Sequence, residues 1–138
     1  MIRHTSTLLL LLVIFMLAIG CTTDSPQSAG VAATPAGYTD LTPAQAKDLI
    51  ETEKDLVVID VSPYYDQGHL PGAISIPLGM LDEKIPSLDA TKPYLVYCHG
   101  DGPSMAGAQK LIDAGFPRVY RLSGNYAAWV SAGYPVEK

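Results

Sequence analysis

The sequence has few cysteines and no concentration of basic residues. It contains two cysteines in 138 residues, and its nine lysines and arginines are outnumbered by fourteen aspartates and glutamates. Without a basic cluster, we do not expect a nucleic acid as a partner. The stretch CHGDGPS at residues 98–104, which holds the second cysteine, contains no lysine or arginine at all. A negative charge on Cys98 would therefore have to be stabilised by something other than a basic side chain of this loop.

An uninterrupted apolar run, LLLLLVIFMLAI, lies near the N-terminus at residues 8–19. Twelve residues are too few for a membrane-spanning helix, which needs about 20, but they are typical of a signal-peptide core. The run leads into LAIGC at residues 17–21, which resembles the lipobox where a bacterial-type prolipoprotein is lipidated on cysteine and cleaved just before it. We therefore expect a signal peptide at residues 1–20 and lipidation of Cys21.

The alternative is an uncleaved N-terminal anchor with an incidental cysteine. Either way, the rest of the chain is expected outside the cytoplasm, in the cell envelope. It would be tied to a membrane and would face the periplasm or the cell surface. With Cys21 lipidated, Cys98 has no intramolecular partner, and a lone free cysteine in an oxidising compartment calls for a functional explanation.

Small and turn-forming residues, TTDSPQSAGVAATPAG, follow Cys21. They include too few large apolar groups to offset the entropy of ordering the segment. We therefore expect residues 21–37 to comprise the lipidated cysteine and a flexible linker. The globular domain is then residues 38–138, which is long enough for one modest hydrophobic core.

Helix and strand patterns alternate along residues 38–138. Thr42-Pro43-Ala44-Gln45 combines an N-cap threonine, a proline at the first helical position and a capping-box glutamine. The apolar run LVVIDV at residues 56–61 is typical of a strand covered on both faces. Such alternation with short connections predicts an α/β fold, in which a parallel sheet carries helices on both faces and places sites at the carboxyl ends of its strands. Strands are expected at residues 56–61, 73–77, 94–97 and 119–122, and helices at 43–53, 79–85, 104–114 and 125–132.

Cys98 follows the predicted strand at residues 94–97 and precedes the predicted helix at 104–114. A thiol reacts as its thiolate, so its pKa must fall below the ordinary value of about 8.5. Backbone N–H groups of the loop and the positive end of the next helix could lower that pKa, and glycines permit the backbone angles that such a cradle requires. A buried, inert cysteine is the alternative. The candidate site consists of Cys98 and the backbone N–H groups of His99, Gly100, Asp101, Gly102 and Ser104.

Four segments carry a family resemblance, and they occur in the family's order and at its spacing. They are Asp60-Val61, GHLPGAISIP at residues 68–77, Tyr97-Cys98 with the loop ending in Ser104, and LSGNYAAW through AGYP at residues 122–135. Residues 38–138 are therefore similar to a single-domain rhodanese, a thiosulfate sulfurtransferase-like protein. The resemblance implies a rhodanese-like fold with a central, mostly parallel five-stranded sheet, and it implies no cofactor or metal.

The resemblance also implies a mechanism. Cys98 would take sulfane sulfur from a donor such as thiosulfate, a polysulfide or a persulfide, and would carry it as a persulfide. A thiophilic acceptor, either a thiol or cyanide, would then remove that sulfur in a covalent ping-pong cycle. The chain would be an exported, membrane-tethered sulfurtransferase.

The sequence departs from the family pattern at charged positions. Ser62 stands where the family often has arginine, Pro103 stands where active members usually have a basic residue, and Asp101 adds a negative charge. Because thiosulfate is a dianion, we expect weak or atypical thiosulfate activity, with His99 as the only partial compensation. An uncharged or persulfide donor is favoured instead. The alternative function is a non-catalytic rhodanese-like module that binds a partner or senses thiol redox state.

Three further features are interpreted as structural. His69 lies in the Gly-His-Leu-Pro-Gly turn with no second histidine or carboxylate at ligand spacing, so we expect it to hydrogen bond within the turn rather than bind a metal. Asp60 ends a buried strand, where a charge needs hydrogen-bond partners. Tyr126 and Trp129 are spaced as neighbours on one helix and are expected in the core.

Overall fold

The computed structural model describes residues 37–138. The expected signal peptide, the lipidation of Cys21 and the linker up to residue 36 lie outside the described residues. Within the described part of the chain, no helix is both long and apolar enough to span a bilayer.

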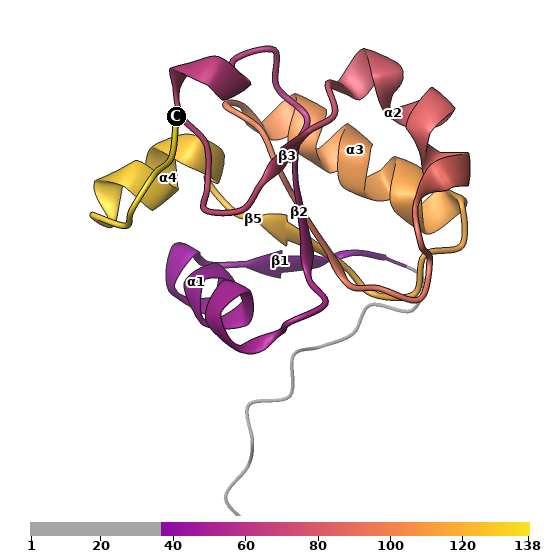
Figure 1. The fold of residues 1–138 in the computed structure, drawn as a ribbon, viewed down its shortest axis with the longest axis horizontal. Helices are drawn as coiled ribbons and strands as arrows, with labels where there is room; N and C mark the ends of the chain where they lie inside the picture. Colours follow the sequence, from indigo (N-terminus) through magenta and orange to yellow (C-terminus); the bar gives the residue numbers. More distant parts are fainter. Residues whose placement is uncertain (1–36) are drawn as a thin grey trace, which may run out of the picture. The chain divides into compact units, whose positions relative to one another are not determined.

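In the described part of the chain, five strands form one sheet in which every pairing is parallel, and this confirms the expected fold class. The strand order is β1-β5-β4-β2-β3, so β4 lies at the centre of the sheet with β5 and β2 on either side (Figure 1). Because the strands are parallel, their carboxyl ends meet at one edge, where sites form in folds of this kind. The strands are β1 (Thr39–Leu41), β2 (Val57–Asp60), β3 (Ile74–Ser75), β4 (Tyr94–Tyr97) and β5 (Val119–Leu122).

Within residues 37–138, four α-helices cover the two faces of the sheet. Helices α1 and α4 lie on one face, and α2 and α3 lie on the other (Figure 1). Helix α1 begins with the expected capping box, since the N–H of Gln45 donates to the Thr42 hydroxyl and the Gln45 side chain accepts from the Thr42 N–H. The helices are α1 (Pro43–Thr52), α2 (Leu78–Lys84), α3 (Asp101–Asp113) and α4 (Asn125–Ser131), and two short 3-10 helices are η1 (Tyr65–Gln67) and η2 (Ile85–Ser87).

The central strand β4 contributes to both hydrophobic layers. Its side chains alternate, as successive residues of a strand must: Leu95 and Tyr97 pack on the α1–α4 side, and Tyr94 and Val96 on the α2–α3 side. Continuing the alternation by one residue places Cys98 on the α2–α3 side. All four residues of β4 are buried, because a central parallel strand is covered on both faces.

Apart from one-residue shifts at element ends and the two 3-10 helices, the observed elements differ from the expected ones in three places. Strand β1 was not expected, strand β3 is shorter than the expected strand at 73–77, and helix α3 begins three residues earlier than expected. Gly100 is the N-cap of α3, so Pro103 is its third helical residue. Proline is tolerated in the first turn because its missing N–H has no partner there in any case. The pattern Gly-Asp-Gly-Pro, expected to be loop, is therefore largely helix.

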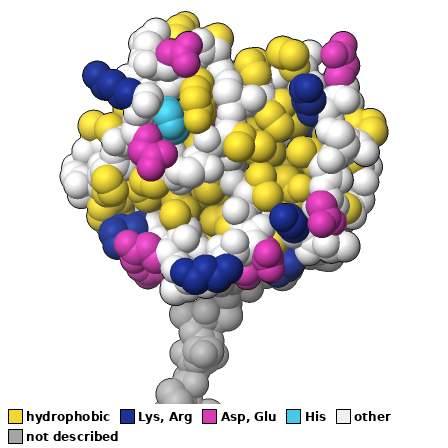
Figure 2. Space-filling view, in the orientation of Figure 1, with side chains coloured by type: hydrophobic (Ala, Val, Ile, Leu, Met, Phe, Trp, Pro, Cys, Tyr) yellow, Lys and Arg dark blue, Asp and Glu magenta, His cyan; other side chains and the backbone are white. Residues whose placement is uncertain are grey.

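The surface carries no basic patch on the face shown in Figure 2. Lysine and arginine side chains on this face lie scattered, several of them beside acidic side chains. The ion pairs of residues 37–138 include Lys110 with Asp82, which joins α3 to α2, and Lys47 with Glu51 within α1. Exposed pairs of this kind add little stability each.

Candidate active site at the carboxyl end of β4

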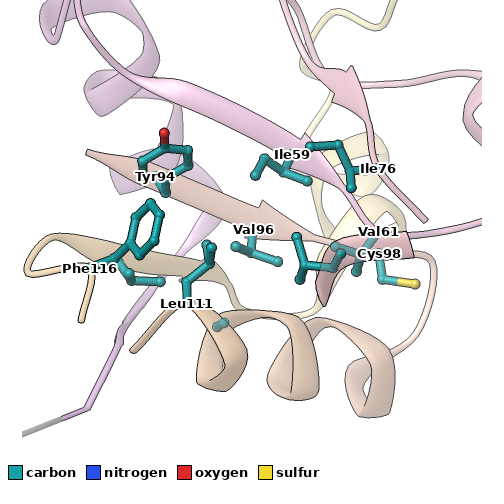
Figure 3. Close-up of a cluster of buried hydrophobic side chains, with 11 residues drawn as sticks. Ile59, Val61, Ile76, Tyr94, Val96, Cys98, Leu111 and Phe116 are labelled. Atoms are coloured by element: carbon teal, nitrogen blue, oxygen red, sulfur yellow. The ribbon is translucent and has the colours of Figure 1, made fainter. Parts of the chain in front are cut away.

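Cys98 directly follows the central strand and is 3% exposed. It contacts the cluster of apolar residues between the sheet and helices α2 and α3, which includes Ile59, Val61 and Val96. Figure 3 shows its sulfur atom at the end of this cluster, pointing away from the aliphatic side chains near the carboxyl end of the strand. The thiol is therefore a buried group at the edge of the sheet where an α/β fold forms its sites.

The backbone of Cys98 is held by the start of helix α4. Its N–H donates to the Asn125 side-chain oxygen at 3.1 Å, and its carbonyl accepts from the Tyr126 N–H at 3.0 Å. Asn125 adopts a left-handed conformation with φ of 57°, which asparagine tolerates better than most residues. Two hydrogen bonds from one turn of α4 thus fix the position of the cysteine backbone.

Four backbone N–H groups come directly after Cys98 and are left free by the residues that the structure describes. The N–H groups of His99, Gly100, Asp101 and Gly102 make no hydrogen bond to any residue of 37–138. Three of these belong to the N-cap and first two residues of α3, where helix geometry leaves N–H groups without partners. They are the donors that this segment can offer to an anionic sulfur.

The remaining member of the predicted set, Ser104, also contacts this turn through its side chain. It is the fourth residue of α3. Its buried hydroxyl donates to the Asp101 carbonyl at 3.0 Å. The Ser104 hydroxyl therefore braces the first turn of α3.

The glycines of the segment are not required by backbone strain. Gly100 is extended, with φ of −152°, and Gly102 is helical. Neither has a neighbour that an added Cβ would meet within 4 Å. The sequence argument that these glycines supply unusual backbone angles was therefore wrong, and what they provide is open space beside the free N–H groups.

The Asp101 carboxylate accepts hydrogen bonds from groups that are distant in the sequence. One of its carboxylate oxygens, Oδ1, accepts from Asn125 Nδ2 at 2.6 Å and from Arg121 Nη1 at 3.1 Å. Arg121, on β5, is buried, and its Nε donates to Asp40 at 2.6 Å. The hydrogen bond that Asp40 accepts from Arg121 raises the pKa of Arg121, and Asp101 acts in the same direction.

Sequence reasoning did not assign Arg121 to the site. The signal that could have found it is a single charge in an otherwise apolar strand, two residues after the buried Val119. Because strand residues alternate, the two side chains share the α3 face of the sheet. A buried arginine on that face must find carboxylates or other acceptors.

Aromatic rings border the site. The His99 ring stacks on Tyr126 with centroids 4.3 Å apart, and Tyr64 lies 5.6 Å from it at a tilt. Nε2 of His99 is buried and has no hydrogen-bond partner among residues 37–138. The histidine ring, directly beside the cysteine in sequence, is therefore placed by contacts with two aromatic rings.

Asp60 and Ser62 form a buried turn after β2. Asp60 Oδ1 accepts from the Ser62 N–H at 2.8 Å, and the Ser62 hydroxyl accepts from the Tyr64 N–H at 3.1 Å. Both residues are fully buried. Ser62 thus has a hydrogen-bonding role in the turn. It stands at the position where the family often has arginine, so no basic side chain is present there.

His69 lies in the turn that contacts the C-terminal segment. Its ring stacks on Tyr65 with centroids 3.8 Å apart, and its backbone forms a two-way bridge with Glu137. These contacts support the structural interpretation of His69. Within residues 37–138 there is no group of three or more histidine, cysteine, aspartate or glutamate side chains that could hold a metal ion.

A family model described as "Rhodanese-like domain" matches residues 42–132, which is more than half of the chain. The match includes Cys98, the free N–H groups after it, and Arg121.

Similar proteins carry a sulfurtransferase name. Thiosulfate sulfurtransferase GlpE of Coxiella burnetii is 32% identical over 94 residues, covering 67% of this chain and 87% of that protein. The protein of the same name from Actinobacillus pleuropneumoniae is 31% identical over 101 residues, covering 72% of this chain and 94% of that one. Among solved structures, a rhodanese-related protein of Thermoplasma volcanium superposes with a TM-score of 0.65 at 27% identity, covering 72% of this chain and 98% of the other.

Proposed function

The chain belongs to the rhodanese-like domain family, and we propose that it is a sulfurtransferase that carries sulfane sulfur as a persulfide on Cys98. The observation that carries this proposal is a run of four consecutive free N–H groups at residues 99–102. They come immediately after a cysteine at the carboxyl end of the central strand. Several N–H groups near one point stabilise an anion. The bound anion would be the Cys98 thiolate first and the terminal sulfur of its persulfide afterwards.

The proposed reaction has two displacement steps. The Cys98 thiolate attacks the outer sulfur of the donor and forms an S–S bond, while the donor's own bond to that sulfur breaks and its electron pair leaves with sulfite, a thiolate or a shortened polysulfide. An acceptor thiolate or cyanide then attacks the terminal sulfur of the persulfide. The Cys98 thiolate leaves with the electron pair of the broken bond, so no external oxidant or reductant is needed.

The charges around Cys98 favour a donor other than thiosulfate. Arg121 is the nearby buried cation, and its guanidinium is already engaged by Asp40 and Asp101. No basic side chain occurs at residues 98–104 to attract a dianion. A polysulfide or a persulfide, which can present a neutral or singly charged sulfur chain, is the proposed donor class, with weak activity toward thiosulfate.

The proposed location is the cell envelope, outside the cytoplasm. Its support is the sequence alone: a signal-peptide core at residues 8–19, a lipobox-like LAIGC ending at Cys21, and a linker up to residue 37. In this proposal, a lipid on Cys21 holds the protein at the membrane, and the domain at residues 38–138 faces the periplasm or the cell surface.

A mass measurement tests the transfer function. In the full chain carrying Cys21→Ser, Cys98 is the one remaining thiol, because the sequence has two cysteines. After incubation with a polysulfide, intact-mass analysis should show the addition of one sulfur atom. The same chain carrying Cys98→Ser should show none, and subsequent addition of cyanide should return the first protein to its original mass with release of thiocyanate.

A second candidate function is a non-catalytic module that binds a partner or senses thiol redox state. The observation that favours it is the 3% exposure of Cys98, since a buried thiol is less accessible to a donor. If no donor among thiosulfate, polysulfide and a small-molecule persulfide adds sulfur to Cys98, the transfer function is overturned in favour of this second candidate.

A further inference from the structure

Arg121 lies on the same face of the sheet as Cys98. Its backbone partner in β4 is Val96, which is two residues before the cysteine. Val96 and Cys98 both belong to the apolar cluster on the α3 side, and so does Val119, two residues before Arg121. Alternation along both strands therefore directs the arginine side chain toward α3, beneath the helix that follows the cysteine.

The guanidinium contacts the first turn of α3 at two residues. Nη1 donates to Asp101 Oδ1 at 3.1 Å and lies 3.4 Å from the Ser104 hydroxyl. Nε donates to Asp40 on β1, which fixes the other side of the planar group. An arginine can satisfy acceptors in several fixed directions at once, which a lysine ammonium cannot reproduce with the same geometry.

The contacts continue from Asp101 to the cysteine itself. The oxygen that accepts from Arg121 also accepts from Asn125 Nδ2 at 2.6 Å. The other side-chain atom of that amide, Asn125 Oδ1, accepts from the Cys98 N–H. A continuous set of hydrogen bonds thus runs from Arg121 through Asp101 and Asn125 to the backbone of Cys98, and leaves the N–H groups at 99–102 free.

We infer that Arg121 is a positioning residue: through Asp101 it holds the first turn of α3, and so sets where the free N–H groups stand relative to the Cys98 sulfur. This inference rests on the proposed function, because it gives those N–H groups a role in stabilising anionic sulfur. It also assigns a purpose to Asp101, whose carboxylate is an acceptor that links strand β5, helix α3 and helix α4.

The competing explanation is that the pair of Arg121 and Asp101 only adds stability. The Asp101 side chain is 67% exposed, and an ion pair with so exposed a member contributes little to folding. A further competitor is a simple charge effect, in which Arg121 favours the thiolate and Asp101 disfavours it without any role in geometry. Each of these two explanations predicts a different effect of substitutions on the thiol pKa of Cys98 than a positioning role of Arg121 does.

The test compares two variants that remove the same charge. In Asp101→Asn, the amide oxygen still accepts from Arg121 and Asn125; in Asp101→Ala, no acceptor remains. The thiol pKa of Cys98 is measured from the pH dependence of its alkylation by iodoacetamide, in the full chain carrying Cys21→Ser. The midpoint reports thiol ionisation rather than exposure, and the neighbouring ionisable residue in the chain, His99, is unchanged in both variants.

If Arg121 is a positioning residue, the alkylation midpoint of Asp101→Ala should lie above that of Asp101→Asn by about one pH unit. This corresponds to a tenfold difference in thiolate population at neutral pH. Arg121→Met should also raise the midpoint, and combining it with Asp101→Ala should raise it no further than Asp101→Ala alone. The matched control is Arg118→Met, since Arg118 pairs with Glu53 at the opposite end of β5. That variant should leave the midpoint at the wild-type value.

Equal midpoints for the two Asp101 variants would overturn the inference, whatever Arg121→Met does. A wild-type midpoint for Arg121→Met in folded protein would overturn it as well. Failure of the proposed function would look different. In that case the parent protein would take up no sulfur from a polysulfide, while the alkylation midpoints would still separate the variants as positioning predicts.

Discussion

The Asn125 side-chain oxygen accepts a hydrogen bond from the backbone N–H of Cys98 at 3.1 Å, although the two residues lie 27 positions apart. Asn125 begins helix α4 in a left-handed conformation, with φ of 57°. Its side-chain nitrogen donates at the same time to Asp101 in the first turn of α3. One amide therefore joins the end of strand β4 to the starts of two helices.

Replacing Asn125 by alanine should destabilise the fold. The buried Cys98 N–H would lose its acceptor, and alanine would be strained at the left-handed position, for a combined loss of about 2 kcal/mol or more. Asn125→Gly is the matched variant, because it loses the same hydrogen bonds without that strain. It should be more stable than Asn125→Ala by about 1 kcal/mol. Urea unfolding measures both differences, and a wild-type midpoint for Asn125→Ala would contradict the assigned role.

An arginine at position 103 should improve the use of thiosulfate. Pro103 is exposed in the first turn of α3, five residues after Cys98, so a side chain there faces solvent. A cation near the thiol should raise kcat/KM for thiosulfate by about tenfold, an energy that a charge pair near a protein surface can supply. Thiocyanate formation from thiosulfate and cyanide measures the effect.

The control for this change is Pro103→Ala, which removes the proline without adding charge. The advantage of Pro103→Arg over Pro103→Ala should shrink as ionic strength rises, because salt screens exposed charges. If the two variants use thiosulfate equally at low salt, missing charge is not what limits this donor.

Replacing Gly68 by alanine should be more costly than the same change at Gly72. Both glycines have positive φ. A Cβ built in its ideal position on Gly68 would lie 2.2 Å from the Tyr126 hydroxyl oxygen, whereas a Cβ on Gly72 would meet nothing within 4 Å. We expect a loss of about 1–2 kcal/mol at Gly72 from backbone strain, and a clearly larger loss at Gly68. Thermal and urea unfolding give the comparison.

The steric part of the Gly68 effect can be isolated with Tyr126→Phe. Removing the hydroxyl takes away the atom that a Cβ at Gly68 would meet first. Gly68→Ala should therefore cost less in the Tyr126→Phe background than in the wild type. Equal costs in the two backgrounds would show that backbone strain alone explains the difference from Gly72.

Cys21→Ser should abolish lipidation. If the chain is processed as a lipoprotein, cells supplied with a labelled fatty acid should incorporate label into the wild type and into Cys98→Ser, but not into Cys21→Ser. The covalent lipid supplies the membrane affinity, since each buried methylene group contributes about 0.8 kcal/mol. An unlabelled wild type that stays in the membrane fraction would instead support an uncleaved N-terminal anchor.

Much of the fold was predictable because its signals are local. The capping box of α1 and the buried run of β2 each occupy only a few consecutive residues. Alternation of strands and helices is enough to predict a parallel sheet, since parallel neighbours need a crossover between them. The three-residue strand β1 was missed because it is too short for a periodic pattern and exists through its pairing with β5.

The position of the candidate site was predictable from the sequence, but the residues that hold the site in place were not. A cysteine after a central strand could be located from the apolar run before it, since a site at that edge follows from the parallel sheet. The start of α3 could not, because Gly-Asp-Gly-Pro has the composition of a loop. Its helical form is accompanied by contacts from Arg121 and Asn125, which lie 20 and 24 residues beyond Asp101.

The amino-acid order alone determined the class of fold and the place of Cys98 after a buried strand, because hydrophobic period and turn chemistry act between near neighbours in the chain. Only the packed structure decided which groups surround that cysteine. It brought Asp40, Asp101 and Arg121 from three different elements into one set of contacts. The Asp101 charge, which looks unfavourable in the linear sequence, became an acceptor for the buried Arg121, since the partner of a buried charge is chosen by folding and not by proximity along the chain.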